Sequence, residues 1–541
     1  MADQRDITAL PDLTRGSGRV GPTRTRMPVY VDLLPPCNNA CPAGENIQEY
    51  LRLVKEGLIQ EAWYELVKNN PFPAIHGRVC YHPCESACNR GCLDESISIH
   101  GVERYLGDKA LEEGWKYLKP EKQSGFRVLV IGSGPAGLSA AYHLARLGHS
   151  VEIRDGAPEP GGMMRYGIPA YRLPRDILDQ EIDRLRELGV TITQNSFVKD
   201  LLKEQAEGQF DAVFVAIGAG LSKRVDIPSM DASKMVDAVS FLKDVASGEH
   251  PQIGRRVAVY GGGNTAMDAA RVARRLGAEE SIVIYRRTAE QMPAHADERE
   301  EAQREGVDMH WLRTISEVDQ SGVKVEIMEL DDNGRPHGTG RFETLEADTV
   351  ILAVGQETDS NFLRKIPGMR FTNDVVNVDP ATLMTDVPGI FAGGDAVPSE
   401  RTVTIGVGHG KRAARSIDSW LYSRAQAPKV KHDVVSFDSL HLWYFGDHER
   451  RMQSELKVAE RTGFDEIVRG LEPEEASFEA IRCLSCGNCI ECDGCLGACP
   501  EDAVIKLGKG FRYRFNYEKC TGCASCFEQC PVHAIDMIPE H

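Results

Sequence analysis

The fold is decided by residues 127–155, which read RVLVIGSGPAGLSAAYHLARLGHSVEIRD. The apolar VLVI predicts a buried parallel strand, followed by a helix and a second strand. Gly132, Gly134 and Gly137 have the spacing that permits a tight turn and brings a pyrophosphate close to a helix N-terminus. Asp155 ends the second strand, where an acid can accept a hydrogen bond from a ribose hydroxyl. The stretch therefore predicts a dinucleotide-binding unit.

A second stretch, residues 256–288, repeats the pattern as RVAVYGGGNTAMDAARVARRLGAEESIVIYRRT. Gly261 and Gly263 belong to its turn, and its second strand ends in Arg286 and Arg287 rather than in an acid. An acid there binds a ribose 2′-hydroxyl and repels a 2′-phosphate, whereas arginine reverses this preference. The stretch therefore predicts NADP(H) rather than NAD(H). The alternative is that both arginines are solvated loop charges.

Length and charge narrow the class of protein. The 541 residues suggest three or four domains. With 63 basic and 81 acidic residues the net charge is -18, which argues against a nucleic-acid binder and against an anionic membrane surface. No apolar run approaches the ~18–20 residues that span a bilayer, and the N-terminus lacks a signal-peptide core. We expect a cytoplasmic protein without membrane insertion.

The 16 cysteines occur in two groups at the ends of the chain. In a reducing compartment they are expected to be metal-bound or catalytic rather than in disulfides. Residues 93–482 contain none, which argues against a flavin-dependent disulfide reductase, because that enzyme needs a redox pair beside the flavin. All are candidate metal ligands: Cys37, Cys41, Cys80, Cys84, Cys88, Cys92, Cys483, Cys486, Cys489, Cys492, Cys495, Cys499, Cys520, Cys523, Cys526 and Cys530.

The last eight cysteines form two runs of the pattern C-x2-C-x2-C-x3-C-P. This is the spacing of bacterial two-cluster ferredoxins, in which the fourth cysteine of each run serves the other cluster. Zinc ribbons also use CxxC pairs, but they do not explain two matched runs. The predicted [4Fe–4S] ligand sets are Cys489, Cys492, Cys495 and Cys530, and Cys520, Cys523, Cys526 and Cys499.

Further motifs between the two cysteine groups point to a known family. They are GGMMRYGIPAYRLP at 161–174, FVAIG at 214–218, YRRTAEQMP at 285–293, ILAVG at 351–355 and GIFAGGD at 389–395. With the two glycine-rich turns, they make residues 30–425 resemble the two-dinucleotide-binding flavoproteins. The resemblance is closest to the small (beta) subunit of bacterial glutamate synthase and its relatives.

The resemblance implies that the first fold holds FAD and that the second, inserted into it, holds NADPH. Hydride transfer between them needs no catalytic side chain, because the cofactors carry the chemistry. The implied FAD residues are Gly132, Gly134, Pro135, Ala136, Gly137, Asp155, Gly162, Arg172, Gly218, Gly355, Gly394 and Asp395. The implied NADP residues are Gly261, Gly263, Asn264, Thr265, Arg286 and Arg287.

The N-terminal cysteines are similar to the helical iron–sulfur domain of the same family, which also occurs in dihydropyrimidine dehydrogenase and usually holds two [4Fe–4S] clusters. The usual Arg-Cys-Leu-x-Cys pair before Cys37 is missing here. Arg482-Cys-Leu-Ser-Cys486 has that form, and its two cysteines are surplus to the ferredoxin runs. Six cysteines cannot ligate two all-cysteine cubanes, whereas the addition of these two supplies eight.

Our hypothesis is that Cys483 and Cys486 fold back to complete an N-terminal cluster with Cys37 and Cys88. A second cluster would use Cys41, Cys80 and Cys84, with either Cys92 or Glu103 as the fourth ligand. The alternatives are a single N-terminal cluster or completion by a neighbouring chain.

The expected architecture is a multidomain α/β protein with a helical N-terminal iron–sulfur domain, two Rossmann-like domains and an α+β ferredoxin-like domain. Within the expected linker between the FAD domain and the ferredoxin-like domain, His441 and Trp443 could either line a surface for a partner or pack in the core of the linker itself. The expected parts are an N-terminal arm (1–30), the helical iron–sulfur domain (31–125), the FAD domain (126–245 and 345–425), the NADP(H) domain (246–344), a linker (426–482) and the ferredoxin-like domain (483–541).

This order of parts predicts an electron-transfer flavoprotein subunit that connects NADP(H), through FAD and clusters, with a one-electron partner. The expected partner is a ferredoxin or a catalytic subunit, such as a 2-oxoacid oxidoreductase, in a hetero-oligomer. Two alternatives are a glutamate synthase (NADPH) small subunit and a non-catalytic iron–sulfur electron wire. The intact glycines and arginines argue against the wire.

Overall fold

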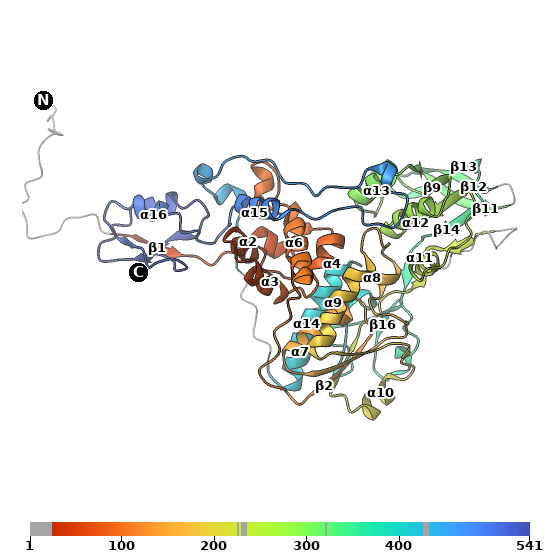
Figure 1. Ribbon diagram of the computed structural model, residues 1–541, viewed down its shortest axis with the longest axis horizontal. Helices are drawn as coiled ribbons and strands as arrows, with labels where there is room; N and C mark the ends of the chain where they lie inside the picture. The colour runs from red at the N-terminus through yellow and green to blue at the C-terminus, as the bar shows by residue number, and fades with distance from the viewer. Residues whose placement is uncertain are drawn as a thin grey trace, which may run out of the picture. The chain divides into compact units, whose positions relative to one another are not determined.

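The structure is a computed structural model that describes residues 24–223, 225, 227–228, 235–319, 322–425 and 432–540. It contains two compact units (Figure 1). The ferredoxin unit consists of Met1–Pro36, Lys431–Asp447 and Leu484–His541, and the nucleotide unit of Cys37–Val430 and His448–Cys483. None of the helices in the described ranges is long and apolar enough to cross a bilayer.

A five-stranded parallel sheet in the order β18-β5-β2-β3-β4 forms the first dinucleotide fold of the nucleotide unit. Helices α7 and α14 lie side by side (Figure 1) and share a core with β2 and α9. The strands are β2 (Arg127–Ile131), β3 (Ser150–Arg154), β4 (Thr191–Thr193), β5 (Ala212–Val215) and β18 (Ile390–Ala392). The helices are α7 (Pro135–Arg146), α8 (Met163–Tyr166), α9 (Arg175–Leu188), α10 (Leu201–Glu207) and α14 (Val403–Leu421).

A second parallel sheet in the order β10-β9-β8-β14-β7 forms the inserted fold. A three-stranded antiparallel sheet, β11-β12-β13, shares a hydrophobic core with it. The strands are β7 (Met235–Asp237), β8 (Arg256–Tyr260), β9 (Glu280–Tyr285), β10 (Val307–Trp311), β11 (Arg313–Val318), β12 (Val323–Leu330), β13 (Pro336–Leu345) and β14 (Thr349–Leu352). The helices are α11 (Ala238–Ala246), α12 (Asn264–Arg275) and α13 (Ala296–Arg304).

The structure places both boundaries of the inserted fold outside the expected range of 246–344. Strand β14 pairs with β8 on one side and with β7 on the other, so it lies inside the second sheet. Its apolar residues Val350 and Ile351 are buried, because a central parallel strand is covered on both faces. The inserted fold therefore begins at β7 and ends after β14.

The helical domain is built on a core to which α15, from the far end of the chain, contributes. Leu471, Ala476 and Ala480 join that core, and α15 packs against α2 and α6. Residues 471–482, expected as part of a linker, thus complete the helical domain, whereas Phe464 and Ile467 of the same linker pack against the core of the inserted fold. The helices are α1 (Pro36–Ala40), α2 (Ile47–Lys55), α3 (Ile59–Val67), α4 (Pro73–Val79), α5 (Pro83–Ser86), η1 (Asn89–Cys92), α6 (Ile99–Glu112) and α15 (Pro473–Arg482).

The buried Arg482 side chain anchors α15 to the helical domain. Its guanidinium lies 2.9 Å from Glu479 Oε2 and 3.1 Å from Asp94 Oδ1, and it donates to the Glu95 carbonyl at 2.6 Å. Arg482→Ala would leave the fully buried Glu479 carboxylate without this partner. We expect the variant to be less stable by about 3–5 kcal/mol, as measured by urea denaturation.

The control for this variant is Arg186→Ala, which removes an exposed arginine at 2.6 Å from Asp183. An exposed pair of this kind contributes about 0–1 kcal/mol. Equal stability losses in the two variants would show that Arg482 does not anchor the helix.

The ferredoxin unit combines the C-terminal cysteine runs with two distant segments. Strand β1 (Arg26–Tyr30) pairs antiparallel with β21 (Ile535–Pro539), and β19 (Val504–Ile505) pairs with β20 (Arg514–Phe515). Short helices α16 (Gly494–Gly497) and α17 (Ser525–Glu528) each contain the third cysteine of a run. Residues 26–30 are thus a strand of this unit rather than an arm, while residues 1–23 of the expected arm lie outside the described residues.

Candidate cofactor sites

A cavity of about 660 Å³ in the nucleotide unit is lined by both glycine-rich turns. Val79 and Tyr81 of the helical domain also line it. The sequence-predicted residues that line the cavity are Gly132, Gly134, Pro135, Ala136, Asp155, Gly162, Arg172, Gly218, Gly263, Asn264, Thr265, Gly355, Gly394 and Asp395. Gly137, Gly261, Arg286 and Arg287 are outside its lining.

Two helix N-termini face this cavity in the same way. Gly134 is the N-cap of α7 and Gly263 is the N-cap of α12. A Cβ atom added at either glycine would meet no atom within 4 Å, so the space at both caps is open. Helix N-termini with open space before them bind pyrophosphate through their backbone N–H groups. The residues therefore fit two dinucleotides in one cavity.

Asp155 is fixed by the turn that it follows. Its Oδ2 accepts hydrogen bonds from the backbone N–H of Ser133 at 2.6 Å and from the Ser133 hydroxyl at 2.5 Å. Its Oδ1 accepts from the backbone N–H of Ala157 at 2.7 Å. These bonds hold the carboxylate at the cavity wall, where a ribose hydroxyl can reach a remaining lone pair.

The two arginines expected to read a 2′-phosphate lie at the end of β9. Arg286 is exposed and Arg287 is partly buried. The loop that carries them folds back to the glycine turn, because the Ala294 N–H donates to the Gly262 carbonyl at 2.9 Å. The Tyr285 hydroxyl donates to the Gln291 carbonyl at 2.8 Å and closes the same loop.

Helix α13, whose charged sequence is usual for a solvated face, carries buried acids. Glu298 pairs with Arg172, which also lies 3.1 Å from Asp268. The buried Arg271 lies 2.7 Å from Glu301 and 2.9 Å from Glu305. The sequence signal was the spacing of Glu298, Glu301 and Glu305, which places all three on one face of a helix. Arg172 thereby links the flavin-side loop to the inserted fold.

Tyr81 is a residue of the helical domain that lines the nucleotide cavity. Its hydroxyl accepts a hydrogen bond from Asn264 Nδ2 at 2.7 Å, and its ring stacks on His295 with 3.5 Å between centroids. The His295 N–H donates to Asn264 Oδ1 at 3.0 Å. Sequence reasoning missed this contact, although Tyr81 directly follows a candidate ligand, Cys80.

The N-terminal cysteines gather around the core of the helical domain. Cys84 is buried in that core, and Cys37, Cys41, Cys88 and Cys483 pack against it. Cys483 thus lies in the helical domain, whereas Cys486 is buried in the ferredoxin unit.

Burial favours the protonated form of the thiols of Cys41, Cys80 and Cys84, which are the expected cysteine ligands of the second N-terminal cluster. Burial, and then the Glu103 charge, raise the pKa of Cys80 to about 12. Burial also raises the pKa of Cys41 and of Cys84. Thiols of this kind stay protonated until a metal replaces the proton. This donor set fits a cluster that is held as bound thiolates.

Glu103 and Cys92 differ sharply as candidates for a fourth ligand. Cys92 is exposed at the end of η1. Glu103 is buried, and Asn70 Nδ2 donates to it at 2.7 Å and to Glu45 at 2.9 Å. Burial raises the pKa of both carboxyl groups. After burial, the charge of Glu103 raises the pKa of Cys80, and the charges of Glu45 and then Glu103 raise the pKa of Cys41.

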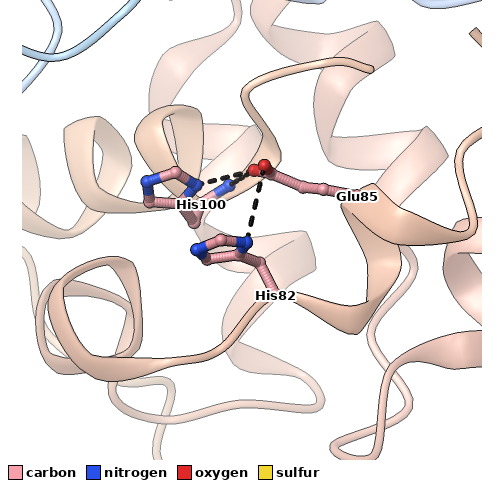
Figure 2. Close-up of side chains that lie close together, drawn as sticks. All are labelled: His82, Glu85 and His100. Atoms are coloured by element: carbon pink, nitrogen blue, oxygen red, sulfur yellow. Dashed lines mark hydrogen bonds and ion pairs between the residues drawn. The ribbon is translucent and has the colours of Figure 1, made fainter. Parts of the chain in front are cut away.

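A histidine–carboxylate group lies beside the same cysteines. Figure 2 shows the imidazoles of His82 and His100 on the carboxylate of Glu85. The Arg450 guanidinium also lies 2.6 Å from Glu85 Oε2. Burial alone would raise the pKa of Glu85, but His100, His82 and Arg450 outweigh it and lower the pKa to about 2. Because the positive charge of Arg450 already balances the negative charge of Glu85, we assign these side chains as an ion-pair network rather than a metal site.

The ferredoxin unit has two small cavities of about 20 Å³ each. Burial raises the pKa of Cys495 to about 12 and that of Cys526 to about 11, as expected for thiols that await a metal. One cavity is lined by Cys489, Cys492, Cys495 and Cys530, and the other by Cys499, Cys520, Cys523 and Cys526. The structure therefore brings together each of the two predicted ligand sets.

The expected linker residues His441 and Trp443 also lie in the ferredoxin unit. His441 Nδ1 is 3.0 Å from the carbonyl of Cys530. Trp443 lies beside Gly494 with 56% of its surface exposed. An exposed tryptophan beside a cluster cavity is compatible with a partner surface.

These folds and sites define a flavin- and pyridine-nucleotide-dependent oxidoreductase with iron–sulfur domains at both ends. The pyridine nucleotide-disulphide oxidoreductase family matches residues 126–427, more than half of the chain, and the protein belongs to this family. Domain II of dihydropyrimidine dehydrogenase, which has a 4Fe-4S cluster, matches residues 33–115, and a 4Fe-4S dicluster domain matches residues 488–534. These matches confirm the predicted fold class, cofactor classes and family.

Relatives with known names cover most of this chain. It is 38% identical to the NADP(+)-dependent formate dehydrogenase subunit beta of Moorella thermoacetica, over 83% of this chain and 70% of that protein. It is 34% identical to the NADPH-Fe(3+) oxidoreductase subunit beta of Geobacter sulfurreducens (strain PCA), over 83% and 75%. It is 32% identical to the glutamate synthase [NADPH] small chain of Azospirillum brasilense, over 73% and 88%. All three relatives are named as one subunit or chain.

Proposed function

We propose that this chain is an electron-transfer subunit that exchanges hydride with NADP(H) and single electrons with a partner enzyme or ferredoxin. FAD, when bound, supplies the conversion between two-electron and one-electron transfer. The residues of the chain supply two nucleotide sites and the cluster ligands. The beta subunits named above, from a formate dehydrogenase and an Fe(3+) oxidoreductase, support a partner of the same general kind.

One observation carries the proposal: a single cavity touches both glycine-rich turns and Tyr81, the neighbour of Cys80. Gly134 and Gly263 would hold the two pyrophosphates, while the hydrogen bond between Asn264 and Tyr81 joins the inserted fold to the helical domain at the cavity wall. A dinucleotide in each site would place the two reactive rings in the same cavity, and such positioning is what hydride transfer requires. The proposal covers electron flow in either direction between NADP(H) and the partner.

We propose Cys37, Cys88, Cys483 and Cys486 as ligands of one N-terminal cluster, and Cys41, Cys80, Cys84 and Glu103 as ligands of the other. Cys37, Cys88 and Cys483 pack on the core of the helical domain, as Cys41 of the second set also does, so the division into two sets and the inclusion of Cys486 rest on the spacing and number of the cysteines. Burial of Glu103 inside the helical domain, against exposure of Cys92, supports the second.

A glutamate synthase small subunit is the second candidate function. The similarity to the Azospirillum small chain over 88% of that protein favours it. The two ferredoxin-type ligand sets at the C-terminus favour the one-electron partner instead, because they add carriers beyond the flavin.

The test is an anaerobic titration of the purified chain with NADPH and, separately, with NADH. We expect NADPH to bleach the flavin and NADH to do so far more slowly, because Arg286 and Arg287 can pair with a 2′-phosphate. Iron analysis should give about 16 atoms per chain, four for each of four cubane clusters. Equal rates with NADH would refute the arginine assignment, and no bleaching with either nucleotide would refute the proposed function in favour of an electron wire.

A further inference from the structure

Thr404, in the first turn of α14, lies between the nucleotide cavity and a candidate cluster ligand. Its neighbours Thr402 and Val403, and Gly406 one turn later, line the cavity. Thr404 itself is outside the lining, is 4% exposed, and its hydroxyl donates to Cys80 Sγ at 3.1 Å. Successive residues of a helix are about 100° apart, so one turn can serve the cavity and the cysteine at once.

The hydroxyl of Thr404 is not needed to cap its helix. Thr402 is the N-cap of α14, and its side chain already accepts a hydrogen bond from the Ile405 N–H at 3.2 Å. Threonine hydroxyls at helix starts usually bond to nearby backbone groups, but this one reaches a residue 324 positions away in the sequence. The bond therefore has a role other than starting the helix.

The Cys80 sulfur also accepts a hydrogen bond from the His82 N–H at 3.3 Å. Two donors thus point at one sulfur, and one of them is a side chain that can be replaced. Hydrogen bonds to ligand sulfurs are among the features that set the reduction potential of an iron–sulfur cluster. A donor stabilises the more negative reduced cluster more than the oxidised one, and so it raises the potential.

We propose that Thr404 is a positioning residue that raises the reduction potential of the N-terminal cluster ligated by Cys80. The inference rests on the proposed function, in which Cys41, Cys80 and Cys84 hold a cluster. The inference adds a structural link between this cluster and the flavin site, which is the first turn of α14. Val403 and Gly406 of this turn line the cavity, and Thr404 of the same turn donates a hydrogen bond to the cluster ligand Cys80.

The test compares Thr404→Val, which removes the hydroxyl at nearly constant volume, with Thr404→Ser, which keeps it. The readout is the midpoint potential of the cluster in the full chain, from a redox titration followed by EPR. The signal that belongs to this cluster is the one lost in Cys80→Ala. At a fixed ambient potential, we expect Thr404→Val to reduce the ratio of reduced to oxidised cluster about tenfold, equivalent to about 59 mV for one electron. Thr404→Ser should stay close to the unsubstituted chain.

The matched control is Thr349→Val. Thr349 is also buried in the nucleotide unit, but its hydroxyl donates to the Ile253 carbonyl at 2.7 Å. This variant makes the same chemical change away from the cysteines and should leave the potential unchanged. A potential that is unchanged in Thr404→Val, or shifted equally in the valine and serine variants, would overturn the inference.

The experiment also separates failure of this inference from failure of the proposed function. If Cys80→Ala leaves the iron content and every EPR signal intact, Cys80 holds no cluster, and this inference fails together with the ligand set proposed above, whereas the proposed function itself fails only if neither nucleotide bleaches the flavin. If Cys80→Ala removes a signal that Thr404→Val does not shift, this inference alone fails. Should valine at this position impair folding, ENDOR of the deuterium-exchanged chain gives a second test. Thr404→Ala should then show one exchangeable coupling to the cluster fewer than the unsubstituted chain.

Discussion

Gly263→Val should shift reduction of the flavin to NADPH concentrations roughly 100-fold higher, while the chain keeps its FAD and its clusters. The backbone at Gly263 has φ -93° and ψ 173°, which any L-residue adopts, and an added Cβ meets no atom within 4 Å. The backbone can therefore accept a Cβ atom at this position without strain. The valine side chain would occupy the open space at the start of α12, where the pyrophosphate of NADPH approaches the helix.

We expect NADPH to bind roughly 100-fold or more weakly in this variant, since a steric cost of about 3 kcal/mol corresponds to that factor. The measurement is the rate of anaerobic flavin bleaching as a function of NADPH concentration. Dithionite, which bypasses the nucleotide site, should still reduce the flavin and the clusters.

The matched variant is Gly134→Val, at the equivalent cap of α7. The backbone there is also compatible with valine, with φ -73° and ψ -179°, and the space is equally open. We expect this protein to be purified without FAD but with its iron. The two sites would be assigned the wrong way round if Gly263→Val lost its FAD. The same conclusion would follow if Gly134→Val kept its FAD and lost only the binding of NADPH.

Cys483→Ala should remove one of the N-terminal clusters. Cys483 packs against the core that also holds Cys37 and Cys88, although 391 positions separate it in the sequence from Cys92, the last of the N-terminal cysteines. Loss of one thiolate from a cubane site usually costs the cluster, so iron should fall from about 16 to about 12 atoms per chain. The double variant with Cys486→Ala should lose no more than the single variant.

The control is Cys92→Ala, which removes the exposed cysteine of the same domain. We expect its iron content and EPR spectrum to match those of the unsubstituted chain, because we propose Glu103 as the fourth ligand of the second cluster. Unchanged iron in Cys483→Ala would refute the fold-back hypothesis. A loss of about four iron atoms in Cys92→Ala would instead make Cys92 the ligand and exclude Glu103.

Cysteine and glycine spacing allowed a large part of this protein to be predicted. The two ferredoxin ligand sets meet in two cavities in the expected combination, because their ligands come from short runs whose spacing is set by local backbone geometry. The two dinucleotide turns followed from strand, glycines, helix and strand within about 30 residues each. The family, fold class and cofactor classes rest on these local patterns.

The boundaries of the parts were harder to predict. Strand β14 has the same apolar pattern in either Rossmann-like fold, and only its pairing with β7 and β8 assigns it to the second sheet. Strand β1 reads as part of a polar arm, and only β21, about 500 residues later, gives its hydrogen bonds partners. A short segment that pairs with a distant one leaves no periodic signal of its own.

The sequence by itself determined which chemistry this protein carries: two dinucleotide sites, thiolate-rich ends and no disulfide redox pair between them. The tertiary structure alone decided how these sites are connected. The placement of Cys483 on the N-terminal core, of Tyr81 beside Asn264 and of the Thr404 hydroxyl on Cys80 joins residues that are 183 or more positions apart. Ligand spacing is a local property of the backbone, whereas such contacts arise only when separate cores pack against one another.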